Sequence, residues 1–248
     1  MIELKSKDQL ELMRQAGRIV AEVLEIMREM VKPGVTTEEL DKAAEQHIRK
    51  CNAIPAFKGY NGFPASLCTS VNEEVVHGIP GLRALKNGDI ISIDCGAIYK
   101  GYVGDAAITL PVGEISTELA NLLAVTSKSL ELGIVQARKG KRLQDISYAI
   151  QSYVEKNGMS VVRDYVGHGI GRKMHEEPQI PNFGKPGRGP RLEIGMALAI
   201  EPMVNLGSYQ VETLEDHWTV VTKDRRASAH FEHTVAITEN GPEILTRT

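Results

Sequence analysis

The chain has 248 residues, of which 42% are hydrophobic and 25% charged, a balance typical of folded globular proteins rather than of disordered or coiled-coil chains. Its 29 basic and 32 acidic residues give a net charge of −3, so no basic excess indicates binding to nucleic acid or to an anionic membrane. The three cysteines, Cys51, Cys68 and Cys95, are too few and too scattered for a disulfide framework, and a reducing cytoplasm is the simplest compartment.

Two amphipathic helices are predicted near the N-terminus. Charges begin at Glu3, which does not fit a signal peptide, and no hydrophobic run is long enough to span a membrane. Hydrophobic residues recur at three- and four-residue steps over residues 7–31, which predicts a helix. Ser6 and Gln9 form a capping-box pattern at its start. A second helix is predicted to start at Thr36 and carries its hydrophobic residues on one face.

Strands follow, and the order of elements is then repeated. Residues 90–94 and 103–110 predict a hairpin, because hydrophobic residues dominate both segments and Lys100 with the following glycine supplies a turn. In the second part of the chain, helices are predicted over residues 117–137 and 143–156, and strands over residues 196–201 and 230–238.

The two parts of the chain align at a nearly constant offset. Helix residues of the first part match residues 106 positions later in the chain, and strand residues match residues 107 positions later. Asp94 thus corresponds to Glu201. We interpret this pattern as a duplicated α+β unit, with halves of about residues 1–112 and 113–248 around a pseudo-twofold axis. A site on that axis would take equivalent residues from each half.

Four carboxylates stand at equivalent places in this repeat. Asp94 and Glu201 end hydrophobic strands. Asp105 and Glu232 lie near the starts of the partner strands, and the hairpin would bring Asp105 nearly opposite Asp94. Each pair of like charges at about 4 Å costs roughly 4 kcal/mol at an effective dielectric constant of about 20. Because no basic residue flanks these positions, two bound divalent cations are the simplest way to balance them.

His168 is the fifth candidate ligand, and it lies in the glycine-rich stretch GHGIG of residues 167–171. The glycines let the backbone approach a ligand closely, and an oxygen-rich set with one imidazole suits Mn, Fe(II), Co or Zn. The stretch matches neither the dinucleotide-binding glycine pattern nor the P-loop, which disfavours phosphate binding.

The other histidines differ in what their positions indicate. His77 and His175 lie beside glycine or proline turns, where they would face a cleft and exchange a proton near neutral pH. His47 is expected to pack on a helix face, and His233 to point to the face opposite Glu232. No pattern assigns a role to the two remaining histidines, His217 and His230.

Six segments carry a resemblance to a known family: NEEVVHGIP at 72–80, GD at 104–105, GHGIG at 167–171, HEEP at 175–178, IEPM at 200–203 and FEHT at 231–234. In this order, and over residues from about 5 to 245, they resemble the methionine aminopeptidases of type I in their short bacterial form. Only 30 residues separate Glu201 from Glu232, which leaves no room for the helical insert of the type II form.

The resemblance implies a pita-bread fold, in which two pseudo-symmetric α/β (α+β) halves surround a curved, mainly antiparallel sheet in a single catalytic domain, residues 1–248. It implies removal of the N-terminal methionine from nascent proteins and peptides, with preference for a small second residue. The implied cofactors are two divalent metal ions (Co, Mn, Fe(II) or Zn), and a monovalent cation near Asn72 and Ser228. The implied metal ligands are Asp94, Asp105, His168, Glu201 and Glu232, with Asp105 and Glu232 bridging both ions.

The same resemblance implies roles for the other site residues. A hydroxide bridging the metals would attack the carbonyl of the first residue, while His175 would stabilise the developing oxyanion and Glu201 would pass a proton to the leaving amine. His77 would contact the scissile amide. Soft and aromatic walls suit a thioether, and the implied methionine pocket consists of Phe63, Cys68 and Trp218, with Phe57 and Tyr60 near its mouth. The family often has Cys and Tyr where this chain has Phe57 and Phe63.

The implied partners are the N-termini of peptides and of nascent chains at the ribosome, and the implied protein is a cytoplasmic monomer. Docking through an N-terminal zinc finger or linker, known in extended members of the family, is not expected. Three other functions stay open. An Xaa-Pro aminopeptidase or prolidase usually has a further N-terminal domain, a pita-bread binding protein without catalysis would lose metal ligands, and a two-metal phosphoesterase would need basic residues to clamp phosphate.

Overall fold

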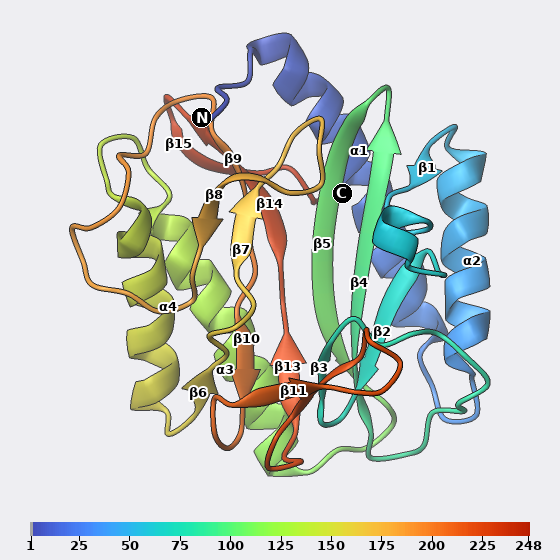
Figure 1. Ribbon diagram of the computed structural model, residues 1–248. Helices are drawn as coiled ribbons and strands as arrows, with labels where there is room; N and C mark the ends of the chain where they lie inside the picture. The colour runs from blue at the N-terminus through green and yellow to red at the C-terminus, as the bar shows by residue number, and fades with distance from the viewer. Residues whose placement is uncertain (1) are drawn as a thin grey trace.

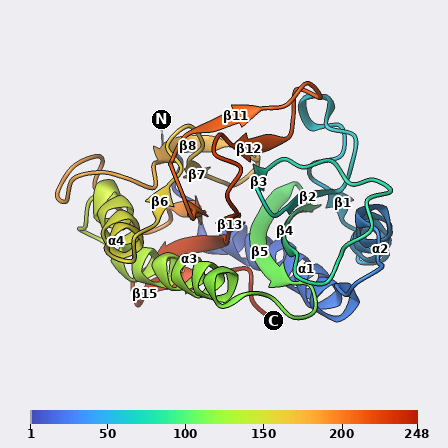
Figure 2. The ribbon, with the colours of Figure 1, turned by 90° about the horizontal axis from the view of Figure 1, so that it is seen from below.

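The computed structural model describes residues 2–248 and contains two halves of similar design, each with two helices packed outside antiparallel strands (Figure 1). The predicted helices are confirmed, with ends within one residue of those expected: α1 (Lys7–Met30), α2 (Thr37–Lys50), α3 (Thr117–Gln136) and α4 (Leu143–Lys156). Seen from below, the helices lie along one side of the strands, and β11 (Val211–Thr213) and β12 (Val220–Thr222) lie on the other (Figure 2).

Capping boxes fix where the first two helices begin. The Ser6 hydroxyl accepts a hydrogen bond from the Gln9 N–H, and the Gln9 side chain accepts one from the Ser6 N–H. Thr36 and Glu39 form the same arrangement at α2. Each box satisfies amide groups that the first helical turn leaves without partners. Within residues 2–248, no helix combines the length and the hydrophobicity needed to cross a bilayer.

The strands form four sheets, and every strand pair in the described residues is antiparallel. One sheet contains β1 (Ile54–Pro55), β4 (Ile90–Tyr99), β2 (Leu67–Val71) and β5 (Tyr102–Pro111). A five-stranded sheet contains β15 (Gly241–Ile244), β14 (His233–Thr238), β9 (Ala197–Ile200), β7 (Gly167–Gly169) and β8 (Glu176–Ile180). The smaller sheets join β13 (Ser228–His230), β10 (Met203–Asn205) and β6 (Ser160–Val161), and β11, β12 and β3 (Glu74–Val76). A single 3-10 turn, Tyr60–Gly62, precedes β2.

The segment 230–238 departs from its prediction as one strand. It is divided between β13, which ends at His230, and β14, which begins at His233. In the break, the N–H of Glu232 donates to the carbonyl of Ala107 on β5 at 2.9 Å, so the chain pairs here with the other half. A hydrogen bond to a distant strand makes this break, and no turn residue marks it. The sequence pattern of a strand therefore continues through it, and the prediction missed it.

Each half has its own hydrophobic core beneath its helices. Leu40 of α2 and Ile93 of β4 belong to the core of the first half, and Ile150 of α4 and Leu198 of β9 to that of the second. A third cluster takes residues from both halves, including Phe63 near the edge of the first sheet. The sequence repeat predicts one core shared by both halves, whereas the structure has a separate core in each half and a mixed cluster between them. The mixed α/β, mainly antiparallel fold class is confirmed.

Candidate metal centre and substrate cavity

A cavity of about 180 Å³ receives side chains from both halves of the chain. All twelve residues to which the sequence analysis assigned a catalytic, metal-binding or substrate-binding role line it: Phe57, Tyr60, Phe63, Cys68, His77, Asp94, Asp105, His168, His175, Glu201, Trp218 and Glu232. Two more lining residues, Asn61 and Met174, were not predicted, because neither belongs to a pattern that marks a site. Among residues 2–248, no lysine or arginine lines the cavity.

The carboxylates of the first half lie on the β4–β5 hairpin. Asp94 pairs with Ala107, and Asp105 pairs with Gly96, so the two aspartates are diagonal neighbours rather than directly opposite each other. A diagonal pair two residues apart points to the same face of a sheet, and the two carboxylates therefore share the cavity wall. The expectation that the hairpin brings the two aspartates nearly opposite each other is therefore confirmed with an offset of two residues, which follows from the turn at Lys100 and Gly101.

The carboxylates of the second half lie just outside regular strands. Glu201 follows β9, and Glu232 stands in the break between β13 and β14. Ile200, the last residue of β9, pairs with His233, the first residue of β14. Glu201 follows Ile200 and Glu232 precedes His233, so both glutamates lie beyond the same end of this antiparallel strand pair. The repeat thus places one carboxylate pair from each half at the cavity.

His168 is the middle residue of β7, between two other strands. A Cβ added at Gly167 would lie 2.4 Å from the carbonyl oxygen of Ala199 on β9, and one at Gly169 would lie 2.1 Å from that of Glu177 on β8. The close strands therefore require both glycines. The Nδ1 of His168 is 2.9 Å from the carbonyl of Gly169, which fixes the proton on Nδ1 and leaves Nε2 free as a ligand atom.

The free Nε2 of His168 faces the carboxylates. It lies 3.5 Å from Oε1 of Glu201 and 4.0 Å from Oδ2 of Asp105. Burial lowers the pKa of His168 to about 4, so the ring is neutral at pH 7 and these contacts are not ion pairs. A neutral imidazole is the form that binds a metal ion.

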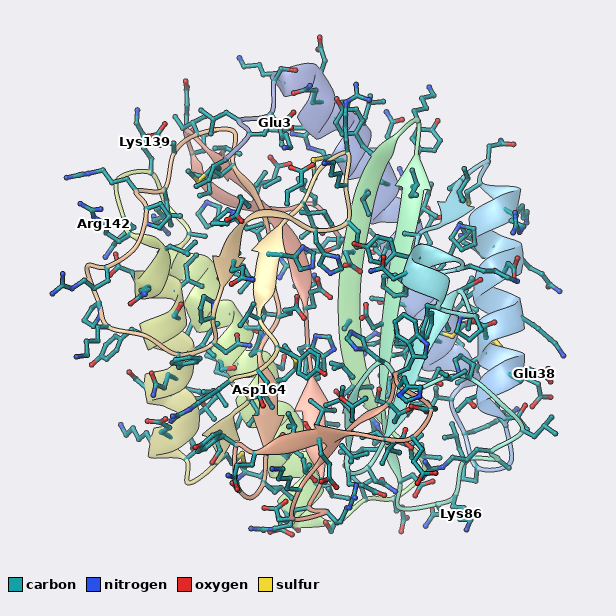
Figure 3. All side chains as sticks on the ribbon, in the orientation of Figure 1. Glu3, Glu38, Lys86, Lys139, Arg142 and Asp164 are labelled. Atoms are coloured by element: carbon teal, nitrogen blue, oxygen red, sulfur yellow. The ribbon has the colours of Figure 1, made fainter. Side chains whose placement is uncertain are left out.

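Without a cation, the carboxylates retain protons. Burial is the main cause that raises the pKa of Asp94 to about 7 and that of Glu201 to about 8. The pKa values of Asp105 and Glu232 are raised well above their usual range by burial and then by neighbouring carboxylates. Lysine and arginine lie elsewhere, and Figure 3 shows the labelled Lys86, Lys139 and Arg142 at the edge of the molecule.

Unpaired oxygen atoms show that a cation fits here. Oδ1 of Asp94, Oδ1 of Asp105 and Oε1 of Glu232 are buried and have no hydrogen-bond partner. One ligand atom each from Asp105, His168 and Glu232 lie within 4.8 Å of one another. Oxygen-rich donor sets with one imidazole are typical of divalent metal sites, so the residues present suit such ions.

His230 is a site residue that the sequence analysis left without a role. Together with Glu201 and Glu232 it forms a second group of ligand atoms within 4.8 Å. Its buried Nε2 has no hydrogen-bond partner and lies 3.5 Å from Oε2 of Glu201. Its position two residues before Glu232 is the one signal that would have indicated it, because residues so close in the chain can reach the same site.

The two predicted substrate histidines lie on different elements. His77 follows β3 with a φ of 61°, and its ring packs edge-on against Tyr165 at 5.5 Å. His175 precedes β8, and its Nδ1 is 2.7 Å from the hydroxyl of Tyr60. Burial lowers the pKa of His77 to about 4 and also lowers that of His175, so both rings are neutral at pH 7.

The wall around these histidines is hydrophobic and aromatic. The rings of Phe63 and Trp218 meet edge to face at 5.1 Å. Cys68 stands on β2 directly opposite Asp94 of β4, and burial raises the pKa of its thiol well above the usual range. The thiol is therefore protonated at neutral pH and forms a soft part of the wall.

The structure places the remaining candidates outside the cavity lining. His233 bonds to the hydroxyl of Thr246 through Nδ1 at 2.8 Å, and His217 is exposed. His47 was expected to serve packing, but its Nε2 lies 3.0 Å from a carboxylate oxygen of Glu22. At the position suggested for a monovalent cation, the Ser228 N–H donates to the Asn72 carbonyl at 2.9 Å.

Comparisons with known proteins agree with this site. The model of metallopeptidase family M24 matches residues 11–239. The chain is 60% identical to the methionine aminopeptidase of Clostridium acetobutylicum, with 99% of each chain covered, and 60% identical to methionine aminopeptidase 1 of Bacillus subtilis, with 100% of each covered. The crystal structure of the Thermotoga maritima methionine aminopeptidase is 49% identical and superposes with a TM-score of 0.99 over 100% of both chains. The chain therefore belongs to metallopeptidase family M24, as one of its methionine aminopeptidases.

Proposed function

We propose that this aminopeptidase works with two divalent cations, which Asp94, Asp105, His168, Glu201 and Glu232 would hold. The observation that carries the proposal is the meeting of four carboxylates and a neutral imidazole in one cavity that no lysine or arginine lines. Three buried carboxylate oxygens without partners support it. When bound, such cations polarise a peptide carbonyl and make water nucleophilic at neutral pH. The donor set accommodates Co, Mn, Fe(II) or Zn.

The chain's own side chains would then orient the substrate and move protons. The Tyr60 hydroxyl lies 2.7 Å from Nδ1 of His175. In the tautomer that carries its proton on Nε2, Nδ1 would accept from this hydroxyl, and the Nε2–H would donate to the carbonyl oxygen as negative charge develops there. The carboxylate of Glu201 would accept a proton from the attacking water and return it to the leaving amine. His77, which also lines the cavity, would contact the scissile amide.

The methionine side chain would occupy the hydrophobic wall formed by Phe63, Cys68 and Trp218, with Phe57 and Tyr60 at its mouth. The cavity has a volume of about 180 Å³ and the metal ligands form part of its lining, so the space beside them is limited. This limit supports a preference for a small second residue. The proposed substrates are the N-termini of peptides and of nascent chains, and the proposed setting is the cytoplasm.

The test is release of free methionine from Met-Ala-Ser by metal-stripped protein, with Mn, Fe(II), Co or Zn added back. We expect activity to become maximal when about two ions occupy the catalytic centre of each chain, and Met-Phe-Ser to react far more slowly than Met-Ala-Ser. Maximal activity with one bound ion would overturn the dinuclear proposal, and equal rates for the two peptides would overturn the small-residue preference. Ala-Pro-Ser serves as the competing substrate, and its cleavage would assign the chain to proline-specific enzymes instead.

A further inference from the structure

A second cluster of metal-ligating side chains lies on the α1–α2 pair, and none of its members lines the cavity. Glu22 belongs to α1, His47 to the last turn of α2, and Cys51 is the C-cap of α2. One ligand atom from each lies within 4.8 Å of the other two. Figure 2 shows these two helices beside each other at the first half's outer side, and they pack together.

The geometry of the three atoms approaches that of a tetrahedral site. His47 and Cys51 are four residues apart and so share a helix face. The distance from Nε2 of His47 to Oε2 of Glu22 is 3.0 Å, and Sγ of Cys51 is 3.5 Å from that nitrogen and 4.0 Å from that oxygen. Around zinc, bond lengths of about 2.3 Å to sulfur and about 2.0–2.1 Å to nitrogen or oxygen separate ligand atoms by about 3.3–3.6 Å. Each observed distance is within about half an ångström of this range.

The surroundings hold the carboxylate in place and leave access for an ion. Oε1 of Glu22 accepts a hydrogen bond from Nε of Arg18 at 3.2 Å, which leaves Oε2 directed at His47. The side chains of His47 and Glu22 are 22% and 33% exposed, so an ion can enter and water can complete its coordination. Carboxylate, imidazole and thiolate together favour Zn²⁺ or Co²⁺ over Mg²⁺ or Ca²⁺.

Other roles for the Cys51 thiol fit less well. Burial and the charge of Glu22 raise its pKa, so the free thiol is a weak nucleophile. The chain's other two cysteines, Cys68 on β2 and Cys95 on β4, are buried, and neither forms a disulfide with Cys51. Cys51 therefore has no cysteine partner for a redox pair and is poorly suited to act as a nucleophile.

We propose that Glu22, His47 and Cys51 form a second transition-metal site, distinct from the catalytic centre, which binds Zn²⁺ and fastens α1 to α2. Its thiolate ligand distinguishes it chemically from the carboxylate and imidazole set of the cavity. Because α1 also packs on β4 and β5, occupancy of this site would stabilise the sheet that carries Asp94 and Asp105.

The experiment uses Co²⁺ as the probe on the full-length, metal-stripped chain. Thiolate-bound cobalt absorbs in the near-ultraviolet by charge transfer, whereas cobalt bound only by carboxylates and imidazole does not. We expect the wild type to develop this band and Cys51→Ser to lack it. His47→Ala should weaken cobalt binding at this site at least about tenfold. Cys68→Ser is the matched control, because Cys68 lines the cavity, and it should keep the band.

Each outcome decides the proposal. Absence of the band in the wild type, or its persistence in Cys51→Ser, would overturn it. Loss of the band in Cys68→Ser would assign the thiolate to the catalytic cavity and would also overturn it. We further expect Cys51→Ser and His47→Ala to fold, by circular dichroism, and to release methionine at the wild-type rate when the catalytic metals are saturating. Zn²⁺ should raise the Tm of the wild type more than that of either variant.

Discussion

The hydroxyl of Thr234 makes two hydrogen bonds with the backbone of Asp105, accepting from its N–H at 3.1 Å and donating to its carbonyl at 2.8 Å. Thr234 lies on β14 and Asp105 on β5, so the contact joins the two halves at a candidate metal ligand. Thr109 of β5 forms the reciprocal pair with the backbone of His230, at 2.9 and 2.8 Å. Each half therefore supplies one threonine that holds a site residue of the other.

This relationship predicts that Thr234→Val destabilises the protein. Valine has the same shape but leaves the buried N–H of Asp105 without an acceptor, which costs about 1–3 kcal/mol. Urea unfolding measures the change. Thr213→Val is the matched control at an exposed position of β11, where we expect a change of no more than about 0.5 kcal/mol. Equal effects at the two positions would show that the hydroxyl pair does not hold the halves together.

The raised carboxyl pKa values predict that metal-free protein loses stability as the pH rises. Asp94 and Glu201 have folded pKa values of about 7 and about 8, above their ordinary values near 4, so the folded state binds more protons in this window. Their contribution is fully present below about pH 4 and is lost as the pH rises through about 7 to 8. The loss is on the order of a few kcal/mol per group.

Urea unfolding of metal-stripped protein from pH 7 to 9 checks this slope, because the buried histidines, whose pKa values are lowered, are neutral in the folded state and largely neutral in the unfolded state in this range. Saturating divalent metal should remove it, because the ligands are then ionised at every pH in the range, and metal binding at pH 6 should release protons. A metal-free stability that increases with pH over this range would contradict the prediction. His233→Ala serves as a control histidine, since its ring bonds to Thr246 outside the cavity, and it should leave the metal dependence unchanged.

Local patterns predicted the helices and the β4–β5 hairpin because periodicity, capping residues and turns are properties of short segments. Ser6 and Thr36, for example, each form a capping box with the residue three positions later, and this pattern marks where the helix begins. The split of the 230–238 segment could not be predicted in this way. It depends on the bond from Glu232 to Ala107, which are 125 residues apart, and only the folded chain brings them together.

The candidate site was predictable to a different degree at each residue. The repeat and the motifs indicated the carboxylates and His168, and the structure brings these residues together at one cavity. His230 and Met174 were missed because a single histidine or methionine carries no pattern. The Glu22–His47–Cys51 cluster was missed because its members lie on two helices, and their proximity follows from helix packing rather than from spacing.

His175 is predicted to act on the rate of the chemical step more than on substrate binding. His175→Ala should lower kcat by about 10²–10³ with little change in KM, because the donated hydrogen bond strengthens as charge develops on the carbonyl oxygen. Tyr60→Phe is the companion variant. It keeps the ring beside His175 but removes the hydroxyl 2.7 Å from Nδ1, so we expect a smaller fall in kcat. Unchanged kcat in His175→Ala would exclude its proposed role.

Trp218 is predicted to determine selectivity for the first residue. Its ring packs edge-on against Phe63, so Trp218→Ala should open the wall and let peptides with other hydrophobic first residues compete. The ratio of kcat/KM for Met-Ala-Ser to that for Leu-Ala-Ser should fall on the order of tenfold, the discrimination that a shaped hydrophobic pocket provides. Trp218→Phe keeps an aromatic wall and should retain most of the ratio. An unchanged ratio in Trp218→Ala would remove this residue from the pocket, and the selectivity would then depend on Phe63 and Cys68.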